Sequence, residues 1–284
     1  MMKLKIYVLI LTIFLLVLPQ KTFANDVFYD DNDSPISLMI EVLPWEIANR
    51  ILPKGKVFTV IDVETGLLFS VQRRAGSKHA DVQPLTRKDT QMMKRIYNGK
   101  WSWDRRAIIA LVGDQMIAAS MHGMPHGGGV LKNGFPGHFC IHFLGSTTHR
   151  SGRMDRSHQL MILKAGGKID EYLNNIDPYE LITIFSTAIN IRDKHILEQT
   201  VDKNDHTSDL IKGVNDFTYF GISHMSFLPV EDLNKQILIE VPVEVEFFRK
   251  NSGKEKKEVH FILRRDSLVD RWYIDDQYIL KELF

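Results

Sequence analysis

A single cysteine, Cys140, is the feature that most limits how this chain of 284 residues can be stabilised. One thiol cannot form an internal disulfide, so the fold must be held together by a hydrophobic core. The chain is long enough for one or two domains of ordinary size, and we expect two.

The first 24 residues have the pattern of a secretory signal. Lys3 and Lys5 precede an apolar run from Ile6 to Leu18, and small residues follow up to Ala24. We therefore expect an exported protein, extracellular or associated with the cell wall. The alternative is a retained anchor, although the run is shorter than the ~20 residues that span a bilayer. The membrane is expected as a partner only if this segment is not cleaved.

The charge balance of the chain is close to neutral, with 36 Lys and Arg residues against 35 Asp and Glu residues. Nucleic-acid binding depends on an excess of positive charge, so this balance argues against nucleic acid as a partner. It leaves small molecules, peptides and cell-wall polymers.

Residues 52–167 are predicted to form a mainly β domain, after a leader or linker at residues 25–51. Alternating and β-branched residues predict two hairpins, Val57–Val63 with Leu67–Val71 and Ala107–Val112 with Met116–Ser120. Helices are expected at Leu43–Leu52, Thr86–Tyr97 and Arg156–Gly166.

Residues 176–284 have the pattern of a separate α+β unit. A helix at Pro178–Asn190 is followed by strand-like segments, which are Phe217–Met225, Gln236–Arg249, Glu258–Arg264 and Trp272–Ile279, with a basic turn at Lys250–Lys257. The segments DPYELITIFSTAINIRDKHILEQTV and RWYIDD resemble the nuclear-transport-factor-2-like fold, which implies a cone-like curved sheet with helices. The histidines in this part are scattered, so we expect an accessory domain.

Seven of the eleven histidines fall between His79 and His158. They surround the cysteine in two segments, MHGMPHG at 121–127 and GHFCIHF at 137–143. An imidazole beside a thiol can accept its proton, and the resulting thiolate attacks carbonyl carbon. The pattern therefore indicates acyl transfer by a Cys–His pair.

These two segments resemble the catalytic motif of the L,D-transpeptidase family, in which a His-Gly element precedes a Ser/Gly-His-Gly-Cys element. Cys140 follows His122 by 18 positions, a spacing that the family uses. The resemblance implies a β sandwich, Cys140 as nucleophile, His122 as general base, His138 as the second motif histidine, and an oxyanion hole from the amides near His138 to Cys140.

The same resemblance implies that the substrate is the stem peptide of peptidoglycan and that no metal or cofactor is needed. We expect the substrate to be bordered by Gly137, Phe139, His142 and His126. Phe139 stands in place of the motif glycine and His142 in place of the usual arginine. These changes would alter the backbone at position 139 and remove a bidentate carboxylate ligand. Transfer to an amine and hydrolysis by water are both open.

Two other functions fit the same residues. A zinc-dependent wall peptidase could use ligands drawn from His79, Asp81, His138, Cys140 and His142, with Asp81 or Asp155 as base. On a strand, His138, Cys140 and His142 would share one face. A wall-binding module whose catalytic site has decayed is the third possibility.

A short aromatic and basic segment could form one rim of the cleft, although a hydrophobic core and a solvated basic turn explain the same residues equally well. Tryptophan faces stack on sugars or peptides, and arginine binds carboxylates. The residues are Trp101, Trp103, Arg105 and Arg106. Asp81 is a candidate for orienting a histidine in the manner of a triad carboxylate.

Overall fold

The computed structural model describes residues 39–148, 152–227, 233–250 and 253–284. The predicted signal at residues 1–24 and most of the predicted leader lie outside these residues, as does His149. Within the described ranges, no helix combines the length and apolar character required to cross a bilayer.

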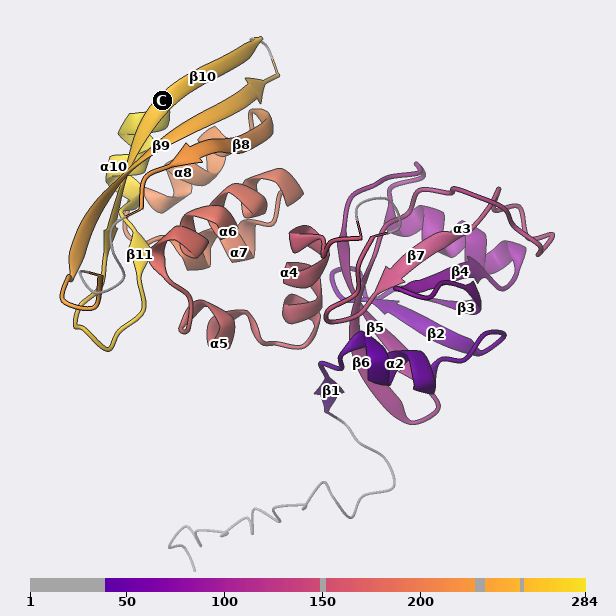
Figure 1. Cartoon of the computed structure of the whole chain (residues 1–284). Coiled ribbons are helices and arrows are strands. Elements are labelled where there is room, and N and C mark those ends of the chain that lie inside the picture. Colours follow the sequence, from indigo (N-terminus) through magenta and orange to yellow (C-terminus); the bar gives the residue numbers. More distant parts are fainter. Residues whose placement is uncertain (1–38, 149–151, 228–232, 251–252) are drawn as a thin grey trace, which may run out of the picture. The chain divides into compact units, whose positions relative to one another are not determined.

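The first half is built on six strands that close into a barrel (Figure 1). Their order is β6-β5-β2-β3-β4-β7, and β7 also pairs with β6 to complete the ring. The strands are β2 (Val57–Asp62), β3 (Leu68–Ala75), β4 (Ala80–Pro84), β5 (Arg106–Val112), β6 (Gln115–Met121) and β7 (Phe139–His142). A short strand β1 (Ile40–Glu41) pairs in parallel with β6.

This arrangement confirms the mainly β character of the first half and both predicted hairpins. The finer expectation of a sandwich is not confirmed, because the observed pairings join all six strands in one ring. Strand alternation fills that ring with apolar side chains, among them Phe58, Val60, Phe69 and Ile108, all 4% exposed or less.

Three helices accompany the barrel: α2 (Trp45–Ile51), α3 (Arg87–Ile96) and α4 (Arg156–Ala165). Helix α3 starts with a capping box, in which the side chains of Thr86 and Asp89 each bond the other's backbone amide. Helix α4 begins at Asp155, whose side chain accepts from the amide of His158. It packs against β5 and β6, so the residues of its first turn lie over the outside of the barrel wall.

The second half is a four-stranded antiparallel sheet with helices on it (Figure 1). The sheet order is β11-β10-β9-β8, from β8 (Phe217–Met225), β9 (Leu238–Arg249), β10 (Lys254–Arg264) and β11 (Tyr273–Ile274). The helices are α5 (Ile169–Leu173), α6 (Pro178–Ile191), α7 (Lys194–Thr200), α8 (Thr207–Val214) and α10 (Asp276–Leu283). The predicted α+β character is confirmed at this level.

One predicted strand in this half is wrong. Trp272–Ile279 was expected to be extended, but only Tyr273 and Ile274 pair with β10. Asp275 then accepts a hydrogen bond from the amide of Tyr278 and starts α10. The strand ends at Ile274 because the next residue, Asp275, is a helix N-cap, and its side chain binds a free backbone amide in the first turn of α10.

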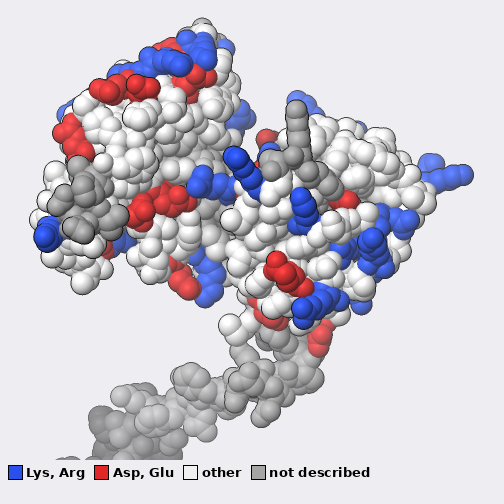
Figure 2. All heavy atoms as spheres, in the orientation of Figure 1, with Lys and Arg blue, Asp and Glu red and all other residues white. Residues whose placement is uncertain are grey.

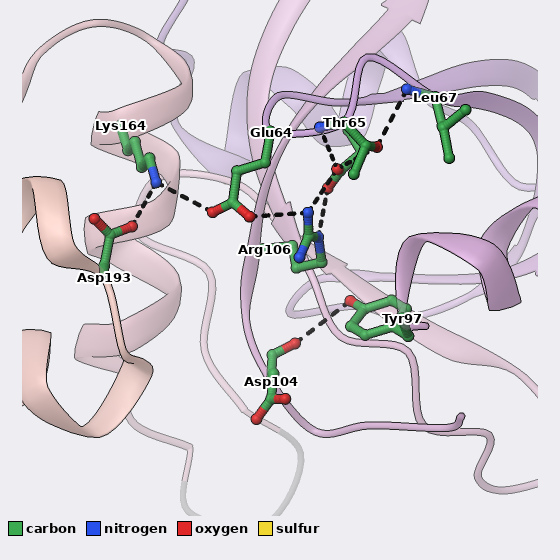
Figure 3. A network of polar contacts seen from close by, with 9 residues as sticks. Glu64, Thr65, Leu67, Tyr97, Asp104, Arg106, Lys164 and Asp193 are labelled. Carbon is green, nitrogen blue, oxygen red and sulfur yellow. Dashed lines mark hydrogen bonds and ion pairs between the residues drawn. The ribbon is translucent and has the colours of Figure 1, made fainter. Parts of the chain in front are cut away.

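A chain of ion pairs runs from the barrel wall to the start of α7 (Figure 3). Arg106 on β5 makes two bonds to the buried carboxylate of Asp62, at 2.6 and 2.7 Å, and also contacts Glu64. Lys164 on α4 contacts Glu64 at 3.2 Å and Asp193 at 2.5 Å. These contacts raise the pKa of Lys164 against the opposing effect of its burial.

The exposed surface carries both signs of charge. Figure 2 shows lysine, arginine and acidic side chains interspersed with broad uncharged areas on the face in view. This distribution agrees with the near-neutral composition.

Candidate functional site

The candidate site lies on the outer face of three neighbouring barrel strands, β4, β7 and β6. Cα partners in the ladder place Asp81 opposite Cys140 and Ser120 opposite His142. Successive side chains on a strand point to opposite faces. The intervening residues belong to the barrel core, and they are Ala80, Val82, Phe139, Ile141, Ala119 and Met121. The polar residues are therefore turned together to the other face of the wall.

A cavity of about 220 Å³ opens on this face. Its lining joins residues from several strands and loops with the first turn of α4: His79, Trp103, Arg105, His122, His126, Cys140, His142, Thr148, Asp155 and His158. Five histidines and the sole cysteine thus meet in one pocket, as their concentration in the sequence indicated.

Cys140 has two polar neighbours in this pocket. Its Sγ lies 3.3 Å from Nε2 of His126 and 3.7 Å from Oδ1 of Asp81. Burial raises the pKa of the Cys140 thiol, and the carboxylate of Asp81 raises it further. The resting group is therefore a neutral thiol, and a base must remove its proton as it reacts.

His126 is oriented to act as that base. Its Nδ1 lies 3.2 Å from the carbonyl oxygen of Met124. A carbonyl oxygen only accepts, so Nδ1 carries the ring proton and Nε2 presents a lone pair to Sγ.

The loop between His126 and His138 is closed by two backbone hydrogen bonds. The amide of each residue donates to the carbonyl of the other, at 2.9 Å in both cases. Gly137 adopts a φ of +120° here, and a Cβ at this position would lie 2.5 Å from the carbonyl oxygen of His126. Only glycine fits this backbone, so Gly137 positions His126 against Cys140.

His122, the base predicted from the motif, lines the same pocket but makes no hydrogen bond to Cys140 within the described residues. Its ring packs against Trp103 with centroids 4.6 Å apart. Burial, followed by the nearby His126, His142 and Arg105, lowers the pKa of His122 to about 2. Its Nδ1 is buried and has no hydrogen-bond partner within the described structure. The contact of its Nε2 with the thiol thus favours His126 over His122 as the base.

A stack of imidazole rings forms the other wall. His142 lies between His79 and His158, with ring centroids 4.6 and 3.9 Å away. His158, from α4, contacts the Ser120 hydroxyl at 2.9 Å through Nδ1. Complete burial lowers the pKa of His158 well below its ordinary value, so this ring is neutral at neutral pH.

Asp81 lies against two histidines of the cluster. Its Oδ1 lies 3.2 Å from Nε2 of His79 and 3.9 Å from Nε2 of His138. The Nδ1 atoms of these rings contact carbonyl oxygens, of Thr147 for His79 and of Gly128 for His138. His138 therefore contacts the carboxylate rather than the thiol.

Two predicted roles need correction. Phe139 was expected to border the substrate, but its side chain is fully buried inside the barrel beside Phe69 and Phe135. Its backbone has no positive φ, so the strand accepts phenylalanine where the family motif has glycine. The amide of His138 was expected in the oxyanion hole, but it donates to His126.

The predicted rim divides into two parts. Trp103 and Arg105 line the pocket, and Arg105 pairs with Asp155 at 2.7 Å. Nε of Arg105 is buried and lacks a hydrogen-bond partner within the described residues. Trp101 and Arg106 are not part of this lining. Trp101 packs edge-on against Phe135, and Arg106 forms an ion pair with Asp62.

The described residues contain two groups with the spacing of metal ligands, and both include Cys140. One is His79, Cys140 and His142, and the other is His122, His126 and Cys140. The first contains three of the five zinc ligands predicted from sequence. His122 and His126 belong to the histidine-rich segment from which zinc ligands are expected, but they lie outside those five, because the loop that returns them to Cys140 is not visible in residue spacing.

The second half of the chain contains a larger cavity, of about 780 Å³, bordered by α6 and by the segment before β11. Its lining includes Tyr179, Phe227, Arg265 and Trp272. Neither metal-ligand group in the described part of the chain lies in this half.

Comparison with protein-family models, with curated proteins and with solved structures gives no match for this chain.

Proposed function

We propose that this protein is an exported cysteine acyl-transferase that acts on the stem peptides of peptidoglycan. The observation that carries the proposal is the 3.3 Å contact between Sγ of Cys140 and Nε2 of His126 at the wall of an open cavity. The resemblance of the MHGMPHG and GHFCIHF segments to L,D-transpeptidases supplies the substrate class. The proposal includes the finer assignments of a transpeptidase-like β domain and a nuclear-transport-factor-2-like accessory domain.

In the first step, Sγ of Cys140 attacks the carbonyl carbon of a peptide bond while His126 Nε2 takes the thiol proton. Attack and proton transfer are coupled because the neighbouring Asp81 disfavours a free thiolate. Collapse of the tetrahedral intermediate breaks the C–N bond, and His126 returns the proton to the departing amine. The product is a thioester on Cys140 and a released amino acid.

In the second step, an amine or water attacks the thioester and gives its proton to His126. The C–S bond breaks, the sulfur regains the proton, and the acyl group leaves on its new acceptor. Transfer and hydrolysis differ only in this acceptor.

Arg105 supports substrate binding in place of the arginine that the family motif has where this chain has His142. Its guanidinium lines the pocket, and the Asp155 pairing leaves its buried Nε available as a donor. A carboxylate or developing oxyanion of the substrate would satisfy this donor. The half-exposed ring of Trp103 provides an apolar surface beside it.

The test is intact-mass measurement of the chelator-treated chain after incubation with a tetrapeptide wall fragment or a carbapenem. We expect one covalent adduct, absent from Cys140→Ala. His126→Gln should slow adduct formation by about 10²- to 10⁴-fold, the usual contribution of a general base. His195→Gln, on the exposed surface of α7, is the matched control and should react as the unaltered chain does.

An adduct that still forms in Cys140→Ala, or no adduct at all with either probe, would refute the proposal. An adduct that forms at an unchanged rate in His126→Gln but slowly in His122→Gln would return the base role to His122. Arg105→Lys should mainly raise the KM for the wall fragment, because the positive charge remains while the fork geometry is lost.

A further inference from the structure

The pocket contains more nitrogen ligands than acyl transfer requires. A single general base serves a thiol, yet four imidazoles approach Cys140 in two pairs. Each pair forms with Sγ a set whose ligand atoms lie within 4.8 Å of one another. This convergence needs an explanation beyond the proposed reaction.

We propose that the pocket binds one thiophilic divalent transition-metal ion, of the Zn²⁺ type, through His122, His126 and Cys140. Two imidazole nitrogens and one thiolate are a natural ligand set for zinc. Three protein ligands would leave a fourth position for water or a small molecule.

His126 has the arrangement of a metal-binding histidine. Its Nδ1–H donates to the Met124 carbonyl, and its Nε2 lies 3.3 Å from Sγ. Ligating histidines usually donate their second ring N–H to a carbonyl or carboxylate, which fixes the orientation of the ring.

His122 provides an independent observation. The side chain is 4% exposed, lines the cavity, and has a buried Nδ1 without a hydrogen-bond partner among the described residues. A buried polar atom without a partner is unfavourable, and coordination of a cation would remove this penalty.

The charges of the pocket also favour a divalent ion. A thiolate on Cys140 and the carboxylate of Asp81 carry two negative charges, and Asp81 is 5% exposed. A dication bound to the sulfur would balance both charges.

The set around His122 and His126 is favoured over the set around His79 and His142. Nε2 of His79 lies 3.2 Å from Asp81, so coordination would require this contact to be exchanged. Because both sets need the same sulfur, we infer one ion per chain.

The experiment is a titration of the reduced, metal-stripped chain with Co²⁺, followed by absorption spectroscopy. We expect one Co²⁺ per chain, a sulfur-to-cobalt charge-transfer band, and the visible bands of a four-coordinate ion, all displaced by Zn²⁺. The charge-transfer band should be absent in Cys140→Ser. His122→Leu and His126→Leu should each weaken binding by at least about tenfold.

The matched variants are His142→Leu and His79→Leu, which should keep the band and bind Co²⁺ within about threefold of the unaltered chain. A site that is lost in these variants but kept in His122→Leu would overturn the assignment, and so would two ions per chain or no charge-transfer band. A second measurement needs no ligand variant: Co²⁺ should quench the emission of Trp103, which packs against His122. Quenching that persists in Trp103→Phe would contradict the site.

Metal binding and acyl transfer are tested separately, although both involve Cys140. Acylation is measured with chelator present, and binding is measured without an acyl donor. A chain that acylates but binds no Co²⁺ refutes only the metal site, and the reverse result refutes only the acyl-transfer proposal.

Discussion

Asp81 and Cys140 face each other across β4 and β7, with the carboxylate oxygen 3.7 Å from the sulfur. An anion at this distance opposes ionisation of the thiol. The pair therefore keeps the proposed nucleophile protonated until a base acts on it.

Removing this charge should make the thiol more reactive. In Asp81→Asn, we expect the pKa of Cys140 to fall relative to the unaltered chain, since Asp81 is the largest cause of its elevation after burial. A fall of one unit would increase alkylation by iodoacetamide at pH 8 by about tenfold. Asp81→Glu, which keeps the charge, is the control. Equal rates in all three chains, with chelator present, would argue against the electrostatic role of Asp81.

Gly137→Ala should damage the site more than its size suggests. The new Cβ would meet the His126 carbonyl at a backbone angle that alanine adopts only with strain. We expect a loss of about 1 to 3 kcal/mol in the free energy of unfolding, measured with urea, together with slower acylation. Gly128→Ala, in the same loop, has open space around its Cβ and should change stability by less than about 0.5 kcal/mol. Similar losses in both variants would count against the close approach at Gly137.

Mild acid should destabilise the chain. The folded-state pKa values of His122 and His158 lie below the ordinary 6.5, so the unfolded chain binds protons that the folded chain does not. Stability from these rings is present above pH 6.5 and is lost as the pH falls below it, by up to about 1.4 kcal/mol per pH unit for each ring. Urea unfolding between pH 7.5 and 5.5 measures this slope. His158→Gln should remove the contribution of one ring to the change in unfolding free energy with pH, whatever its effect on absolute stability. An unchanged slope would show that His158 does not take up a proton on unfolding.

The two ion pairs of Lys164 should differ in strength. Its partner Asp193 has a side chain only 4% exposed, whereas that of Glu64 is 46% exposed (Figure 3). In double-mutant cycles with Lys164→Met, we expect a coupling of about 1 kcal/mol or more with Asp193→Asn and less than about 0.5 kcal/mol with Glu64→Gln. Equal couplings would show that burial does not decide the strength of these pairs.

Much of the local structure could be predicted from the sequence, because the signals lie close together along the chain. The capping box at Thr86 and Asp89 and the helix after Asp155 are examples. The closure of the barrel could not, because the pairing of β6 with β7 joins strands on either side of a long loop. Strand β4 was not predicted either, because it has only five residues and ends in proline, a residue that is uncommon inside sheets.

The candidate site shows the same division. The gathering of histidines around Cys140 was predicted from their concentration in the sequence. The choice between His122 and His126 was not, because it depends on the backbone bridge to His138. Phe139 is buried because alternate residues of β7 point into the barrel. The comparison with a motif glycine does not reveal which face of the strand this position takes.

The closed ring also restricts how a peptide of the proposed kind would reach Cys140. Many proteins that bind peptides add the ligand as an extra strand along an open sheet edge. Within the described barrel, β7 pairs with β4 at Cys140 and with β6 at Ile141 and His142, so neither side of this strand offers a long open edge. Under the proposed function, a peptide would approach the outer wall of the barrel and be recognised mainly through side chains. The pocket would then be sensitive to substituents at the reacting carbonyl and tolerant of main chains that cannot form a regular strand.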